Sequence, residues 1–168
     1  MVDIRTQAGL QRSFAGQYYD ASGELLLHID APTLRGAQLS QQWLDFADLS
    51  GQDLQMADLS GTSLDVAQLN GADLKCATMR DTGLAGTDLR GADLSGADLT
   101  DANLTWAKLH GAVLLGACME GTAFIRCAAL PKALGLDQII HSGQSSMDIV
   151  TIMACLPCMR VTRRITTR

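Results

Sequence analysis

The chain has 168 residues and a net charge of −5; 47% of its residues are hydrophobic and 18% are charged. This length allows one domain with short additions, and the apolar fraction is sufficient for a buried core. An acidic balance argues against direct binding of nucleic acid, which needs a basic surface to neutralise phosphates. No apolar run reaches the roughly 18 residues of a transmembrane helix, and the chain starts without an apolar signal-peptide core. We expect no membrane anchor.

The segment before the repeats contains one pattern that predicts structure. Residues 18–29 join two tyrosines, a short polar stretch with a glycine, and an apolar run that ends at Ile29. This order predicts two short strands around a turn. Such a hairpin could cover the strand edge of the repeat region that follows. We therefore assign residues 1–31 to an N-terminal β cap.

A repeat with a period of five occupies residues 32–126. Two positions before each of the nineteen large apolar residues stands alanine in twelve cases and threonine in four; the exceptions are Pro32, Gln42 and Gln52. Two positions after it, glycine stands in ten of the nineteen cases. The large residues are Leu34, Leu39, Leu44, Leu49, Leu54, Leu59, Leu64, Leu69, Leu74, Met79, Leu84, Leu89, Leu94, Leu99, Leu104, Leu109, Leu114, Met119 and Phe124.

A period of five excludes both an amphipathic helix and one continuous strand. In a helix, residues five apart point about 140° away from each other. In a strand, the large residues would change face at every repeat. The pattern is satisfied if each repeat is a three-residue strand and a two-residue corner, with the small and large residues inward. The expected inward residues include Ala57, Leu59, Ala97 and Leu99.

A slower period of twenty lies on top of the first. It spaces the glycines Gly51, Gly71, Gly91 and Gly111. One such period contains four repeats, so the spacing predicts a four-sided coil with one repeat on each side. Stacked coils would pair in parallel about 4.8 Å apart and form an all-β solenoid. The nineteen repeats then make about 4.75 coils and a rod roughly 23 Å long.

The repeat resembles that of the pentapeptide repeat protein family, whose consensus is Ala-Asp/Asn-Leu-X-X. The segments that carry the resemblance include Gly71-Ala72-Asp73-Leu74 and Asp101-Ala102-Asn103-Leu104. The resemblance covers residues 32–126 and implies a right-handed quadrilateral parallel β-helix.

Residues 127–168 are expected to cap the far end, because Ala129 stands where the next large residue should be. Pro131 predicts the start of a short helix that ends near Gly135. Ser145 and Asp148 are typical of a capping box, which predicts a second helix. Its apolar residues could pack on the rod, or they could join two copies in a dimer through the C-termini. They are Ile149, Val150, Ile152, Met153 and Leu156.

Two kinds of outward column are candidate sites. The repeats carry 12 acidic and 6 basic side chains, and residues 127–168 carry two acidic and five basic ones. Acidic columns could imitate a DNA backbone, or they could simply suit turns and keep the surface soluble. They comprise Asp53, Asp73 and Asp93, then Asp58 and Asp98, then Asp48 and Asp88.

An apolar corner is the second candidate. Phe46, Val66, Gly86 and Trp106 occupy equivalent positions, with Trp43 on the adjacent side. The fold does not need outward aromatics, which often mark contacts with partners. The alternative is that the terminal segments cover them.

No residue set predicts catalysis, a metal or a cofactor. Cys155 and Cys158 form a lone Cys-X-X-Cys motif. A zinc site would need two more ligands, and a thioredoxin-like redox site would need a strand followed by a helix around the motif. Cys76 and Cys118 should lie two coils apart, about 9.6 Å, which is beyond disulfide reach. We expect reduced cysteines and a cytoplasmic location.

Three functions stay open. The first is a non-catalytic module, a rigid rod that presents residue columns to a protein partner. The second is implied by the resemblance: some pentapeptide repeat proteins resemble B-form DNA and bind DNA gyrase or topoisomerase IV, protecting these type II topoisomerases from quinolones or peptide toxins. A 23 Å rod matches only about seven base pairs at roughly 3.4 Å each, and end-to-end dimerisation would double that span. The third is a redox protein that uses Cys155 and Cys158.

Overall fold

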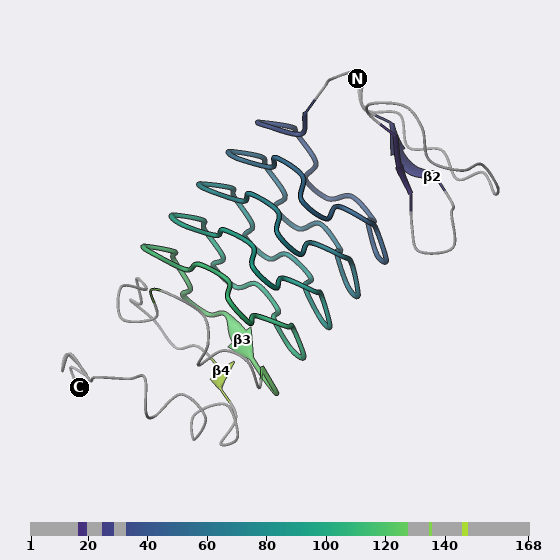
Figure 1. Ribbon diagram of the computed structural model, residues 1–168. Coiled ribbons are helices and arrows are strands. Elements are labelled where there is room, and N and C mark those ends of the chain that lie inside the picture. The colour runs from purple at the N-terminus through teal and green to yellow at the C-terminus, as the bar shows by residue number, and fades with distance from the viewer. Residues whose placement is uncertain (1–16, 20–24, 29–32, 128–134, 136–145, 148–168) are drawn as a thin grey trace.

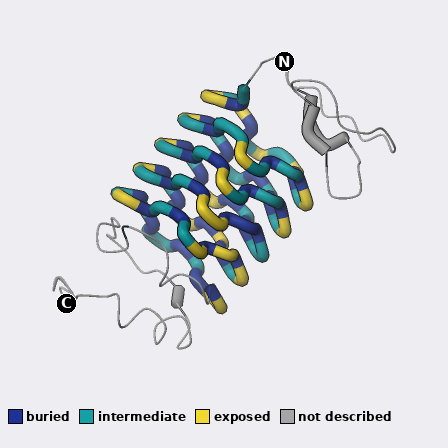
Figure 2. Tube along the Cα trace, viewed as in Figure 1, coloured by how far each residue is buried: buried dark blue, intermediate teal, exposed yellow. Residues whose placement is uncertain are grey.

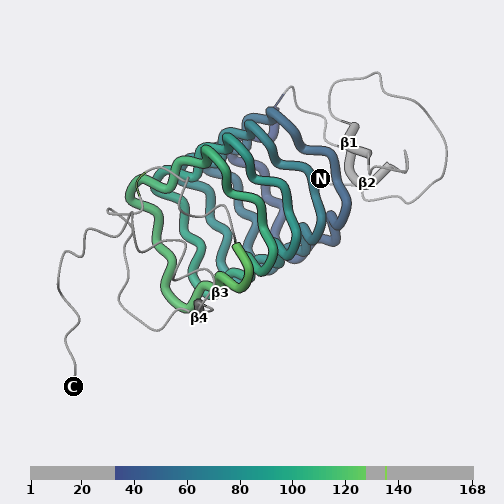
Figure 3. Tube along the Cα trace, turned by 60° about the horizontal axis from the view of Figure 1, so that its bottom comes forward, coloured from purple at the N-terminus to yellow at the C-terminus, as the bar shows by residue number. Residues whose placement is uncertain are grey.

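The computed structural model describes residues 17–19, 25–28, 33–127, 135 and 146–147. Residues 33–127 wind into a stack of similar coils, which Figures 1 and 3 show from two directions. Figure 2 shows buried and exposed residues alternating along every coil, so each coil contributes both to the core and to the outer surface.

Parallel backbone pairing joins each coil to the next at a separation of twenty positions. Bridges connect Asp53 to Asp73 and Asp73 to Asp93. The N–H of Leu74 donates to the carbonyl of Asp93 at 2.7 Å, and the N–H of Asp73 donates to the carbonyl of Gln52 at 2.9 Å. Because this separation contains four repeats, the coil has four sides, as the spacing of the glycines predicted.

Each side is shorter than the three-residue strand that we expected. A four-residue turn begins at the large residue, where the N–H of Ala77 donates to the carbonyl of Leu74 at 3.1 Å. This turn uses both the large residue and the next small one. Only the residue between two turns, such as Asp73, is left to bridge the neighbouring coils. The expected strand length is wrong for this reason.

The third residue of every turn has a left-handed backbone. Its φ lies between 55° and 72° at all nineteen positions, nine of which are not glycine. This is the conformation that type II turns require, and glycine adopts it with the least strain. One corner carries glycine in every coil, and we call it the glycine corner: Gly51, Gly71, Gly91 and Gly111.

The interior is one apolar core of leucine and alanine. Ala57, Leu59, Ala97 and Leu99 are fully buried, which confirms the inward assignment. The inward threonines each donate their hydroxyl to the carbonyl of a large residue in the preceding coil, at 2.6–2.9 Å. Buried hydroxyls are therefore partnered, as their desolvation requires. These residues are Thr62, Thr82, Thr87 and Thr122.

Two glutamines replace the small inward residue in the first coils. Both are half-buried rather than enclosed. Nε2 of Gln42 donates to the carbonyl of Ser40 at 2.9 Å, and the N–H of Gln52 keeps its turn bond to Leu49 at 3.2 Å. The polar amide of Gln42 thus finds the partner that an inward glutamine needs.

The N-terminal segment forms the predicted pair of strands. β1 (Gln17–Tyr19) pairs antiparallel with β2 (Leu25–His28), with an irregularity between Tyr18 and Tyr19. Figure 1 shows β2 at the N-terminal end of the coil. That this hairpin protects the strand edge of the first coil stays a prediction.

At the other end the chain returns to pair with the last coil. β3 (Ala123–Phe124) pairs in parallel with β4 (Ser146–Met147), and Phe124 is buried at the end of the column of large residues. The helix predicted from Ser145 is wrong at Ser146–Met147. The open edge of the coil offers backbone partners there, and a strand satisfies them.

The other C-terminal predictions lie outside the described residues. They include the short helix after Pro131, the Cys155 and Cys158 pair, and the apolar face of the cap or dimer. That face comprises Ile149, Val150, Ile152, Met153 and Leu156.

Replacing Leu74 by Asp should unfold the rod, because this fully buried position would enclose an unpaired charge. Far-UV circular dichroism and a thermal melt would measure the loss. Asn103→Asp is the control, since it adds the same charge at an exposed position that matches the family consensus. A Leu74→Asp protein that melts with the parent would contradict the inward assignment.

Val66→Gly should leave stability equal to the parent's or raise it by up to about 1 kcal/mol. Left-handed backbone costs a residue with a Cβ about 1–2 kcal/mol, and the unfolded-chain entropy of glycine offsets only part of that. Val66 has a φ of 61°.

The reverse change, Gly71→Val, should lower stability by about 1 kcal/mol, since the φ there is 68° and a Cβ would meet no atom within 4 Å. The two melting temperatures should therefore move apart by a few degrees. Identical shifts in the same direction would show that corner strain does not control stability.

Candidate protein-interaction surface

The apolar corner column lies along one edge of the rod. Phe46, Val66 and Trp106 are 53%, 47% and 56% exposed, and Trp43 on the adjacent side is 77% exposed. We use the name apolar corner column for these four residues. A Cβ built at Gly86 would lie 3.6 Å from Cγ2 of Val66, so side chains at this corner stack along the axis. The structure therefore leaves all four residues that the sequence singled out exposed, with Phe46, Val66 and Trp106 at the same corner of different coils.

The backbone at this corner makes the apolar side chains more unusual. Phe46, Val66 and Trp106 have φ values of 62°, 61° and 66°. Each would be less strained as glycine, and the neighbouring glycine corner does carry glycine in every coil. Strain kept where the fold does not need it is a reason to look for a function.

A cation closes the C-terminal end of the column. The guanidinium carbon of Arg126 lies 4.7 Å from the ring centroid of Trp106, one coil earlier. This is a cation–π contact, which holds the indole in place while the residue stays 56% exposed. The sequence analysis did not single out Arg126, although it occupies the same corner as Trp106 in the next coil.

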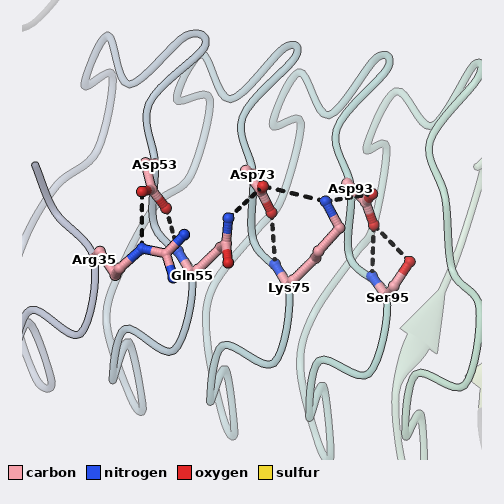
Figure 4. A network of polar contacts seen from close by, with 7 residues as sticks. All are labelled: Arg35, Asp53, Gln55, Asp73, Lys75, Asp93 and Ser95. Atoms are coloured by element: carbon pink, nitrogen blue, oxygen red, sulfur yellow. Dashed lines mark hydrogen bonds and ion pairs between the residues drawn. The ribbon is translucent and has the colours of Figure 1, made fainter.

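Each aspartate of the first acidic column pairs with a cation of the chain. Lys75 reaches Asp73 at 3.1 Å and Asp93 at 2.9 Å, and Arg35 reaches Asp53 at 3.0 Å. Figure 4 shows these side chains as one continuous network along the rod, which also includes Gln55 and Ser95. This column is therefore not an open stripe of negative charge.

Hydrogen bonds fix the ionisation of this network. The hydrogen bonds that Lys75 donates to the carboxylates of Asp93 and Asp73 raise the pKa of Lys75. Desolvation raises the pKa of Asp53. The hydrogen bonds from Arg35 and from the backbone of Gln55 together outweigh this effect, so the pKa lies below its usual value. Lys75 and Asp53 therefore both stay charged near neutral pH.

Ion pairs also occur in the other two acidic columns. Both oxygens of Asp88 accept hydrogen bonds from Arg90 at 2.7–3.1 Å, and Lys108 lies 3.7 Å away. Arg80 pairs with Asp98 at 2.9 Å. Asp48 and Asp58 accept backbone hydrogen bonds from the residues two positions later, as in Asx turns. These contacts support the interpretation that aspartate stabilises the turns.

Two other carboxylates lie beside the apolar corner column and were missed in the sequence. Oδ1 of Asp45 accepts hydrogen bonds from the hydroxyl of Ser63 and from the N–H of Asp65, and Oδ1 of Asp65 accepts from the N–H of Ala85 at 2.8 Å. Each precedes a residue of the apolar corner column directly. That adjacency in the sequence was the available signal.

Within the described residues, no three His, Cys, Asp or Glu side chains gather in a way that could hold a metal. Cys76 and Cys118 are free thiols, and Sγ of Cys127 donates to the carbonyl of Leu104 at 2.7 Å. No helix in the described part of the chain is long and apolar enough to cross a membrane.

Acid should destabilise the rod partly through Asp88, which is 2% exposed as a side chain. Its hydrogen bonds from Arg90 lower its pKa in the folded state. The stabilisation is present above the unfolded value of about 3.9 and is lost as the pH falls through the lower folded value. Asp88→Asn should cost about 1 kcal/mol at pH 7 and should weaken the fall in melting temperature below about pH 4.

The control for this titration is Asp81→Asn, at an exposed corner where the described residues provide no ion pair. It should keep the parent's acid dependence more closely than Asp88→Asn does. Parallel melting curves for all three proteins between pH 7 and about pH 3 would exclude Asp88 as a contributor.

Comparison with known proteins supports the architecture. The family model for pentapeptide repeats matches in 8 copies over residues 34–65, 43–81, 53–96, 79–116 and 87–124, which is more than half of the chain. No similar protein was found among curated proteins.

Several crystal structures of pentapeptide repeat proteins are similar. Rfr23 from the cyanobacterium Cyanothece 51142 is 31% identical with a TM-score of 0.46, and the alignment covers 60% of this chain and 64% of that one. The protein alr5209 from Nostoc PCC 7120 is 28% identical with a TM-score of 0.47, covering 65% and 83%. QnrB1, a plasmid-mediated fluoroquinolone resistance protein, is 12% identical with a TM-score of 0.42, covering 77% and 73%.

The match to the family model explains the four-sided coil described above. It accounts for the period of five, for the four sides, and for the right-handed quadrilateral β-helix that the family implies. This chain belongs to the pentapeptide repeat family.

Proposed function

We propose that this chain is a non-catalytic protein-binding module that contacts its partner through the apolar corner column. The observation that carries the proposal is the pair of exposed tryptophans with Phe46 and Val66, three of the four at corners where glycine would be less strained. Aromatic side chains supply large contact areas and are enriched at interfaces. The rigid coil holds them in one line.

The charges favour this role over DNA mimicry. Binding a site made for DNA needs a continuous negative surface, and Arg35, Lys75, Arg80 and Arg90 each pair with a carboxylate in the acidic columns. The likeness to QnrB1 is too distant to carry a role across. A binding partner among the type II topoisomerases stays the alternative, and a gyrase supercoiling assay would detect it.

The proposal is tested by capture of a partner from a lysate of the source organism. The full chain and its Phe46→Ser/Trp106→Ser variant would be immobilised, and bound proteins quantified by mass spectrometry. The variant should keep the circular dichroism of the parent, since both side chains point outward. It should retain at most about a tenth of the partner if two aromatic contacts of roughly 1 kcal/mol each are lost.

The matched control is Met56→Ser/Leu115→Ser. These two residues are also exposed and apolar, but they lie on a different corner and side of the coil. Capture should be unchanged in this variant. Equal capture by the parent and by both double variants would reject the apolar corner column as the binding surface.

A further inference from the structure

Two carboxylates beside the apolar corner column have no ion pair among the described residues. Among the described residues, no lysine, arginine or histidine nitrogen forms an ion pair with Asp45 or Asp65. The hydrogen bonds that the described residues donate to these carboxylates use Oδ1, so Oδ2 of each has no donor within this part of the chain. The two residues occupy the same place in successive coils, so like charges stand one coil apart, at about 4.8 Å.

This arrangement contrasts with the ion-paired column of Figure 4. There, the position directly after the large residue carries Arg35 and Lys75, and these cations neutralise the aspartates beside them. At the apolar corner, the same position of the repeat carries Asp45 and Asp65 instead. The described residues therefore supply cations to the other acidic columns and none to this pair.

The carboxylates lie among the aromatic side chains. The carboxylate of Asp45 accepts a hydrogen bond from the hydroxyl of Ser63, and Ser63 forms a parallel backbone bridge with Trp43. Asp45 also directly precedes Phe46 at the corner. A Cβ built at Gly83 would lie 3.1 Å from Oδ1 of Asp65, so this carboxylate covers the position one coil further along that side. Acidic and apolar groups thus share one surface over the first coils.

We propose that this surface binds a basic amphipathic segment of a protein partner, in which lysine or arginine side chains flank apolar ones. The apolar side chains pack on the exposed aromatics, and the cations pair with Asp45 and Asp65. Charge complementarity fixes this choice, because an acidic segment would meet two unpaired carboxylates. The inference rests on the proposed function and adds the chemical class of the partner.

The column also has a direction. Its first two coils carry the carboxylates, and its last described coil carries Arg126 over Trp106. Phe46 and Arg126 are four coils apart, about 19 Å, which an extended segment of about six residues spans. The basic residues of the segment lie at the end near Trp43, and the end near Arg126 accepts a neutral or acidic residue.

The test uses tryptophan fluorescence of the full chain. The protein has two tryptophans, and both belong to the apolar corner column, so emission reports on this surface alone. Three synthetic peptides of about six residues, free of aromatics, would be titrated: alternating lysine and leucine, alternating glutamate and leucine, and alternating lysine and serine. The lysine–leucine peptide should give a saturable blue shift and protect the tryptophans from iodide.

A matched pair of variants isolates the charge. Asp45→Asn/Asp65→Asn keeps the Oδ1 acceptors and should weaken the lysine–leucine peptide about fivefold, with less dependence on salt. Asp81→Asn/Asp101→Asn removes a second stacked pair at another corner, where the described residues also provide no ion pair, and should leave affinity unchanged. If both double variants weakened binding of the lysine–leucine peptide equally, the peptide would be attracted only by the overall negative charge, and the proposal would be overturned.

Other outcomes separate this inference from the proposed function. If the glutamate–leucine peptide binds as well as the lysine–leucine peptide, or if neither binds, the proposal of a basic partner segment is wrong. The proposed function is tested independently of this result, by partner capture with the Phe46→Ser/Trp106→Ser variant. The chain's own basic tail is another possible occupant. If Arg163→Glu/Arg164→Glu alone shifts the emission of the free protein to the red, the tail covers the column, and the proposal of a basic partner is overturned.

Discussion

The backbone ladder between successive coils is the interaction on which the rest of the structure depends. Around Leu74, backbone hydrogen bonds of 2.7–3.1 Å close the turn and tie the repeat to both neighbouring coils. A slip of one residue would turn a buried leucine outward and bury an aspartate. The register is therefore fixed by burial, and every outward position becomes one member of a straight column with a step of about 4.8 Å.

That regular step amplifies surface electrostatics. Two unit charges about 4.8 Å apart repel by about 1 kcal/mol even at the dielectric constant of water, so an uninterrupted aspartate column would destabilise the rod. Lys75 solves this by lying between Asp73 and Asp93 and pairing with both. Asp45 and Asp65, which lie beside the exposed aromatics, differ from this rule because no cation of the described residues pairs with them.

The repeat pattern, with its periods of five and twenty, was enough to predict which side chains are buried, how many repeats make one coil, and which residues share a corner. It could not predict that turns take up four of every five positions, because a turn bond such as Ala77 to Leu74 leaves no trace in hydrophobicity. Nor could it predict the pairing of Lys75 or the strand at Ser146–Met147. Both depend on contacts across coils, and the second lies where the period has ended.

The apolar part of the candidate site was predicted from the sequence, and its charged part was missed. Phe46, Val66 and Trp106 depart from the glycine pattern and are visible at once. Asp45 and Asp65 also stand outside the usual aspartate position, directly after the large residue, but what distinguishes them is the cations near them in space, which the sequence pattern does not give. The left-handed corners tolerate such departures because the inward residues and the backbone ladder carry the stability. A corner residue can therefore change without changing the fold, which places the difference between one such rod and another in its corner columns.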